Sequence, residues 1–146
     1  MLKRMILLAL MAGLFLAACG EKQEQIDDPV SVTRKAVEVS LAFDMEGLKT
    51  LSCAEMRKEI DEQRADFEET MNILKGMGVD LSQLRYDMSQ VTFELVEESE
   101  FTAKVHMGGV LTVKVPGLAE ESQEQDQDVK LRKEDGRWLV CSELQN

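Results

Sequence analysis

Cysteine, histidine and tyrosine are the side chains of this sequence that could do chemistry, and they are few. The chain has three cysteines (Cys19, Cys53 and Cys141), one histidine (His106) and one tyrosine (Tyr86). Such groups can bind metals, move protons or form covalent bonds. The sequence has a single histidine, and its acids do not follow the pattern of an EF-hand loop. It therefore contains no spacing typical of metal ligands. No Gly-rich phosphate loop, Walker pattern or serine-nucleophile elbow appears, so we expect no cofactor.

Cys19 stands at the end of a stretch that is typical of an export signal. Residues 1–4 are positively charged, residues 5–15 are uncharged and almost all apolar, and Leu-Ala-Ala-Cys follows at 16–19. A positive start, an apolar middle and small residues at the end describe a secretory signal peptide. The apolar run is shorter than the roughly 20 residues of a transmembrane helix. We therefore expect residues 1–18 to be a leader.

Leu-Ala-Ala-Cys at 16–19 resembles the lipobox of bacterial lipoproteins. In that family the cysteine carries a diacylglyceryl group, and the leader is cut just before it. The resemblance implies that Cys19 begins the mature chain and is lipidated with acyl chains such as palmitate, which would tether it to a bacterial membrane outside the cytoplasm. Gly20 stands where an aspartate would resemble an inner-membrane retention signal, which favours the outer membrane in a diderm host. The alternative is an ordinary signal peptide with a chance cysteine.

Charge excludes one class of partner. The whole chain has a net charge of −11, and loss of residues 1–18 removes Lys3 and Arg4 but no acid, which leaves −13. DNA phosphates repel such a surface, so we expect no nucleic-acid partner. The mature chain is long enough for one core. We expect residues 19–28 to be the lipidated cysteine and a tether that reaches at most about 30 Å, and residues 29–146 to form one domain.

Cys53 and Cys141 remain if Cys19 carries lipid. Two cysteines in an exported chain allow one disulfide, because exported thiols tend to oxidise. That bond would close a long loop and would stabilise the fold by roughly 4–5 kcal/mol in the chain-entropy model. The alternative is two buried free thiols.

The first half of the domain has helical patterns. Asp28-Pro29 is a helix start that leads an amphipathic helix to about Asp44, and residues 45–51 form a short helical turn. Residues 52–55, Ser-Cys-Ala-Glu, have the capping-box pattern and open a helix that ends near Gly76. One apolar stripe along this helix is expected to lie in the core: Met56, Ile60, Phe67, Met71 and Leu74.

After residue 78 the pattern alternates as in strands. A phase slip near Ser89-Gln90 predicts a bulge. Residues 101–115 keep one parity, which predicts one long strand bent at Gly108-Gly109 and no hairpin there. The acidic, Gln-rich residues 118–128 predict a mobile loop. Asp135-Gly136 predicts the last hairpin, with Trp138 and Leu139 on opposite faces of its final strand.

Helices followed by a bent antiparallel sheet of about four strands make an α+β fold. The order, with "AVEVSLAFDMEGLKTL" at 36–51, "FTAKVHMGGVLTV" at 101–113 and "LRKEDGRWLVC" at 131–141, resembles uncharacterised bacterial lipoproteins of the nuclear transport factor two-like, or cystatin-like, superfamily. The resemblance implies a cone of helices on a curved sheet, often with a pocket. Cysteines beside the second helix and in the final strand also look like features of these lipoproteins, which supports a Cys53–Cys141 disulfide.

Three functions follow as expectations. The first is a non-catalytic lipoprotein module that binds an envelope protein or a second copy through the open sheet face, because either Trp138 or Leu139 should lie outward. The second is a binder of a small apolar ligand in a cone lined by residues such as Phe93, Val105 and Met107. The third and least favoured is an isomerase- or cyclase-like enzyme, which needs a buried carboxylate beside Tyr86 or His106. We expect no catalytic residue: Tyr86 should be a core tyrosine and His106 a solvated strand residue.

Overall fold

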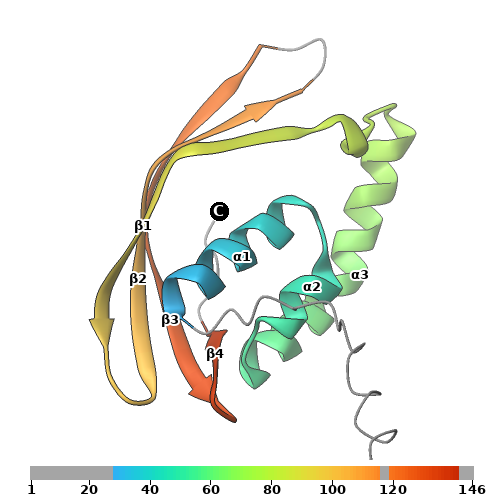
Figure 1. Cartoon of the computed structure of the whole chain (residues 1–146). Coiled ribbons are helices and arrows are strands. Elements are labelled where there is room, and N and C mark those ends of the chain that lie inside the picture. Colours follow the sequence, from blue (N-terminus) through green and yellow to red (C-terminus); the bar gives the residue numbers. More distant parts are fainter. Residues whose placement is uncertain (1–27, 116–118, 142–146) are drawn as a thin grey trace, which may run out of the picture.

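The fold is α+β, as predicted: three helices pack against a curled antiparallel sheet that forms a half-barrel (Figure 1). The computed structural model describes residues 28–115 and 119–141. The strands pair in the order β1-β2-β3-β4, with each strand beside its neighbour in sequence. The elements are α1 (Pro29–Leu41), α2 (Met45–Thr50), α3 (Ala54–Gly76), the 3-10 turn η1 (Leu81–Gln83), β1 (Arg85–Glu98), β2 (Thr102–Lys114), β3 (Glu121–Glu134) and β4 (Arg137–Val140).

Helix α1 lies inside the curve of the sheet and fills one half of it (Figure 1). The helix starts as its sequence predicts, because the Asp28 carboxylate accepts a 2.9 Å hydrogen bond from the Ser31 amide and Pro29 occupies the first turn. Its inner face packs against the strands in two clusters, and the larger of them holds Val32 and Ala36. The fully buried members of this larger cluster include Val32, Ala36, Val105, Val129 and Val140.

Helix α3 begins differently from the prediction. Cys53 is its N-cap and makes no side-chain cap bond, so the expected capping box at Ser52 is wrong. The Ser52 hydroxyl instead donates to the Leu48 carbonyl oxygen at 2.7 Å. The reason is that Ser52 forms a bridge with Val140 of the sheet, which turns its side chain back toward α2.

Two predictions about β1 and β2 are confirmed. The register of β1 on β2 shifts between Asp87 and Gln90, where the phase slip predicted a bulge. Strand β2 runs unbroken and takes its bend at Gly109, whose φ is +92°. Glycine suits this position because the region of positive φ costs other residues energy.

The prediction of a mobile loop over residues 118–128 is wrong for the described part of that range. Glu121 to Asp128 belong to β3 and pair with β2 in one uninterrupted register, from Val113↔Glu121 to Thr102↔Arg132. Ladder bonds join backbone groups, so a polar run can extend a strand wherever its neighbour supplies a regular edge.

The last strand also differs from expectation. Leu131 pairs with Val140, as predicted. Trp138 and Leu139 are both only 5% exposed, so the expectation that one of them lies outward is wrong. The reason is that the chain around Ser52 lies along the outer edge of β4: the Cys53 amide donates to Val140 at 2.9 Å, and the Val140 amide donates to Leu51 at 2.8 Å. The outer edge of β4 is therefore paired, and Trp138 and Leu139 offer no open apolar face.

Candidate functional site

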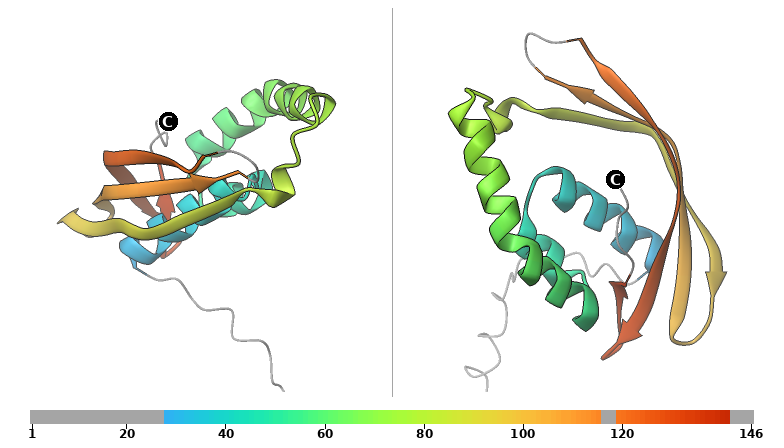
Figure 2. Two further views of the ribbon diagram at one scale, coloured as in Figure 1. Left: turned by 90° about the horizontal axis from the view of Figure 1, so that it is seen from above. Right: turned by 180° about the vertical axis from the view of Figure 1, so that it is seen from behind.

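The candidate site is a groove of about 1130 Å³ between α3 and the concave side of the sheet. Figure 2 shows β1 starting beside the end of α3 and crossing to the sheet, whereas α1 lies inside the curve of the sheet, nearer to β4. The α3 side of the wall runs from Met56 to Phe67, and of its apolar members Met56 and Ile60 are buried whereas Phe67 is half-buried. Beyond Phe67 no residue of the helix lines the groove.

The floor and walls of the groove are apolar. Strands β1 and β2 contribute side chains from one face of the sheet, and α3 contributes side chains at helical spacing. Four methionines and three aromatic residues are among them. The apolar lining residues are Val37, Leu41, Phe43, Met45, Leu48, Met56, Ile60, Phe67, Tyr86, Met88, Val91, Met107, Leu111 and Val113.

The rim is polar and carries charge of one sign. Its charged residues are Glu59 on α3 and Glu124 and Asp126 on β3, and the lining contains no lysine or arginine. Its other polar members are Ser40, Gln63, Gln123, Gln125 and Gln127. The groove thus combines an apolar interior with a negative potential at its mouth.

Tyr86 is part of the groove wall rather than a core residue. Burial raises the pKa of its phenol above the ordinary value, because the charged phenolate is poorly solvated there. Within the described part of the chain no hydrogen bond reaches its hydroxyl, and the buried polar side chains are Thr33 and Ser52. No buried carboxylate therefore lies beside Tyr86 among residues 28–115 and 119–141.

His106 lies away from the groove. It sits on the face of β2 opposite to its neighbours Val105 and Met107, which are buried. Its Nδ1 is 3.0 Å from Asp128 Oδ1, and its Nε2 is 3.7 Å from Asp126 Oδ1. The structure thus separates the two candidate proton-transfer residues onto opposite faces of the sheet.

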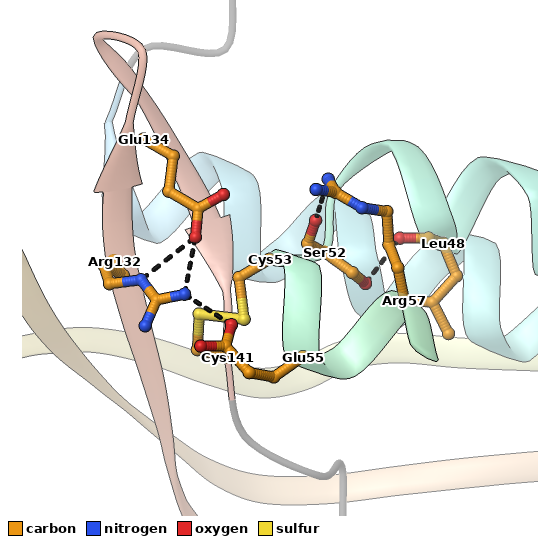
Figure 3. Close-up of a disulfide and its surroundings, with 8 residues drawn as sticks. All are labelled: Leu48, Ser52, Cys53, Glu55, Arg57, Arg132, Glu134 and Cys141. Atoms are coloured by element: carbon orange, nitrogen blue, oxygen red, sulfur yellow. Dashed lines mark hydrogen bonds and ion pairs between the residues drawn. A yellow bond between two sulfur atoms is a disulfide. The ribbon is translucent and has the colours of Figure 1, made fainter. Parts of the chain in front are cut away.

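The base of α3 is fastened beside the two cysteines (Figure 3). The sulfur atoms of Cys53 and Cys141 lie at disulfide distance, with their Cα atoms 5.4 Å apart. Beside them the Arg132 guanidinium bonds to the carboxylates of Glu55 and Glu134. This hydrogen bond and the positive charge lower the pKa of Glu55 below its usual range.

Ligand atoms of Cys53, Glu55, Glu134 and Cys141 lie within 4.8 Å of one another, which is close enough to consider a metal. However, the guanidinium of Arg132 already pairs with both carboxylates, and each sulfur faces the other. The cluster therefore serves to hold α3 against the sheet edge.

A second set of contacts holds the first part of α3 to the helices beneath it. Lys49 Nζ is 2.6 Å from Asp61 Oδ1, Arg64 pairs with Glu46, and the rings of Phe43 and Phe67 are 6.2 Å apart. All of these contacts involve residues up to Phe67. The last part of the helix has exposed apolar side chains, with Ile73 56% exposed and Met77 72% exposed just beyond it.

Sequence reasoning found only part of this site. Of the residues predicted to line a cavity, Met107 does so, whereas Val105 is sealed in the core and Phe93 lies under the Arg34 guanidinium. Phe67 was predicted to be core but is a half-buried wall of the groove. An apolar stripe predicts that one face of a helix avoids water, but it does not say whether that face is covered.

Comparison with known proteins shows little. No family model matches the chain, and no curated protein does. Among solved structures, a SEC-C motif containing protein from Rhodopseudomonas palustris is similar, with a TM-score of 0.46 and 16% sequence identity over 81% of this chain and 78% of that one. The described residues contain no helix long and apolar enough to cross a membrane.

The predicted membership of the nuclear transport factor two-like, or cystatin-like, lipoproteins is wrong. No family model supports that membership, and the solved structure found to be similar is a SEC-C motif containing protein. The prediction depended on the order of elements and on a bent strand followed by a hairpin. Many α+β folds share that order, because it only requires helices to cover one face of a sheet.

Proposed function

We propose that this protein is a non-catalytic, membrane-tethered binding module that holds a segment of another protein in the groove between α3 and the sheet. The observation that carries the proposal is the apolar lining of that groove, in which seven apolar side chains, among them Phe67, Tyr86 and Met88, are only half-buried. Contiguous apolar surface that stays open in a folded chain is typical of an interaction site. The proposed docking surface is therefore the concave side of the sheet, and no longer the open sheet face expected near Trp138.

The shape of the groove favours a protein segment over a small molecule. Its volume of about 1130 Å³ exceeds the roughly 300–1,000 Å³ of common small-molecule sites. The lining methionines Met45, Met56, Met88 and Met107 have flexible side chains that adapt to varied partners. A small apolar ligand remains the second candidate, because the half-buried Tyr86 hydroxyl has a free hydrogen-bonding capacity inside an apolar wall.

The location is a proposal that depends on residues 1–19, which lie outside the described residues. A lipid on Cys19 would hold the domain close to an extracytoplasmic membrane surface, the outer membrane in a diderm host, because the tether reaches at most about 30 Å. Oxidation of Cys53 and Cys141 to a disulfide belongs to the same proposal, since exported proteins keep such bonds. We propose an envelope protein as the partner, and neither nucleic acid nor a catalytic role.

A neutral solvatochromic dye tests the groove on the intact mature chain. We expect the dye to bind, and Phe67→Glu to weaken its binding by about tenfold, because a carboxylate would enter the apolar wall. Ile73→Glu is the matched control on the same helix, since Ile73 is exposed and does not line the groove. Absence of dye binding, or equal effects of the two variants, would contradict the proposal. Mass spectrometry of organic extracts then separates the candidates, because a stoichiometric small molecule would favour the ligand binder.

A further inference from the structure

One edge of strand β3 borders the groove. Strand β4 pairs only with Leu131 to Glu134, and within the described residues the stretch from Glu121 to Val129 has β2 on one side and no strand on the other. The Cys141 amide reaches Lys130, and the described chain adds no further backbone bond to this edge beyond that point. An unpaired strand edge is a template for another strand.

The backbone groups that face this edge can be assigned. The Lys130 carbonyl oxygen accepts from Cys141, so Lys130 points its backbone groups away from β2. Lys133, of the opposite parity, points its amide toward Phe101 at the start of β2. Backbone direction alternates along a strand, and the β2–β3 register is regular. The N–H and C=O groups of Ser122, Glu124, Asp126 and Asp128 therefore face the edge of β3 that no strand of residues 28–115 and 119–141 covers.

The lining of the groove shows that this edge, and not only the face of the strand, meets the cavity. Strands β1 and β2 contribute separated residues, such as Tyr86, Met88 and Val91. Strand β3 contributes five consecutive residues, 123 to 127. Side chains of one strand alternate between the two faces, so a continuous run indicates that the backbone edge itself lines the cavity.

The other edge of the sheet, along β1, is a poorer template. Strand β1 changes register twice on β2, between Asp87 and Gln90 and between Leu95 and Glu97. Bulges interrupt the even spacing of backbone groups that an added strand needs. Strand β3 has no such shift.

Charge along β3 selects the occupant. The side chains of Glu124, Asp126 and Asp128 share the outer face of the sheet, next to the edge groups of the same residues. A second copy of this chain would bring the same acids against them, and like charges placed opposite one another destabilise strand pairing. A strand that alternates basic and apolar residues would place the basic ones opposite these acids and the apolar ones in the groove.

We propose that the occupant of the groove is an extended, alternately basic and apolar segment of a partner protein, which adds to the sheet as a strand on the 122–128 edge of β3. This inference depends on the proposed function, which it makes more specific. Main-chain hydrogen bonds would hold the segment, and the apolar lining and the acidic edge would select its sequence.

A synthetic peptide of alternating lysine and valine is the probe. In a strand added antiparallel to β3, the lysine amides would donate to β3, whereas the valine amides would point away from it. We expect saturable binding by calorimetry that weakens with salt. A peptide methylated on its lysine backbone amides should bind at least about tenfold more weakly, because its donors are blocked. A peptide methylated on its valine backbone amides is the control, and its affinity for the protein should fall less.

Two variants of one residue make the matched test in the protein. Asp126→Pro removes an edge donor without touching the bonds to β2, and proline is tolerated on edge strands. Asp126→Ala removes the same charge and keeps the donor. We expect the proline variant to bind the peptide more weakly than the alanine variant by about tenfold, with equal unfolding midpoints.

Three outcomes would overturn the strand addition. The first is equal binding of the two methylated peptides, and the second is equal affinity of the proline and alanine variants for the peptide. The third is dimerisation of the protein without bound peptide, which would place a second copy on the edge. Dye binding in the groove without peptide binding would also reject it, and would leave the proposed function intact. Failure of both dye and peptide would reject the two together.

Discussion

The backbone amide of Cys53 donates a hydrogen bond to the carbonyl oxygen of Val140 at 2.9 Å. The next residue after Val140 is Cys141, whose sulfur lies at disulfide distance from that of Cys53. Two fastenings, one through the backbone and one through the side chains, thus join the start of α3 to the last strand. The position of α3, and with it the width of the groove, depends on this junction.

The double variant Cys53→Ser/Cys141→Ser should be less stable by about 4–5 kcal/mol, because 88 residues separate the two cysteines and the bond restricts the unfolded chain. Urea unfolding followed by the fluorescence of Trp138, the single tryptophan, measures the change. Reductant should shift the midpoint of the original chain and leave that of the double variant unchanged. A midpoint insensitive to reductant would show that the thiols are free.

Gly109→Ala should destabilise the fold by roughly 1–3 kcal/mol, since φ is +92° there and a Cβ would overlap the Gln90 carbonyl oxygen. Gly76→Ala is the control: a Cβ there meets nothing within 4 Å, and alanine favours the helix by up to about 1 kcal/mol. Thermal unfolding compares the two variants. Equal shifts would mean that β2 can bend without glycine.

Asp28→Ala should cost about 1 kcal/mol at neutral pH, because the N-cap of α1 is lost. Hydrogen bonds from Ser31 hold the pKa of Asp28 below its usual 3.8. A lowered folded-state pKa contributes stability above the unfolded value, and that contribution disappears as pH falls through the folded value. The original chain and the alanine variant should therefore converge in acid. Asp28→Asn should keep most of the cap at neutral pH. If the difference in stability between the original chain and Asp28→Ala stayed constant down to low pH, the role of the carboxylate would be refuted.

Tyr86 provides a direct readout of the groove, because it is the single tyrosine. Burial raises its pKa above the usual 10.0, so its ultraviolet titration should lie at higher pH in the folded chain than in urea. The neutral phenol favours folding below the unfolded value, and this contribution is lost as pH rises through the folded one. An apolar occupant should raise the pKa further. Tyr86→Phe identifies the signal, and an unchanged titration with bound peptide would place the peptide elsewhere.

Cys19→Ser should release the protein from membranes into the soluble extracytoplasmic fraction or leave the leader uncut, because the thiol that would carry the lipid is missing. Mass spectrometry of the native N-terminus provides the measurement. We expect a chain that begins at Cys19 and carries acyl groups. A native chain that starts elsewhere, or has an unmodified thiol at Cys19, would refute the anchor.

The local signals of the sequence predicted most of the elements. Asp28-Pro29 predicted the start of α1, and the one-parity run through residues 101–115 predicted a long bent β2, because capping and alternation act between near neighbours. The polar stretch 121–128 gave no such signal. Its strand conformation depends on the β2 edge beside it, which is a tertiary effect.

The groove was harder to predict for a related reason. Phe67 and Met56 have the same apolar spacing on α3, yet Met56 is buried in the core and Phe67 is a half-buried wall. Which of them is covered depends on where the sheet curves away from the helix. Periodicity indicates the inner face of a helix, but it has no information about the distance to the next layer.

The four methionines of the groove lining make this surface sensitive to oxidants. Peroxide converts a thioether to a sulfoxide, which replaces an adaptable apolar side chain by a polar one. The half-buried Met88 should react before the buried Met107, and each added oxygen should be visible as a mass increase that accompanies weaker dye binding. If the protein lies outside the reducing cytoplasm, its affinity for a partner would thus fall gradually under oxidative stress. A sulfoxide reductase in the same compartment would be needed to restore that affinity.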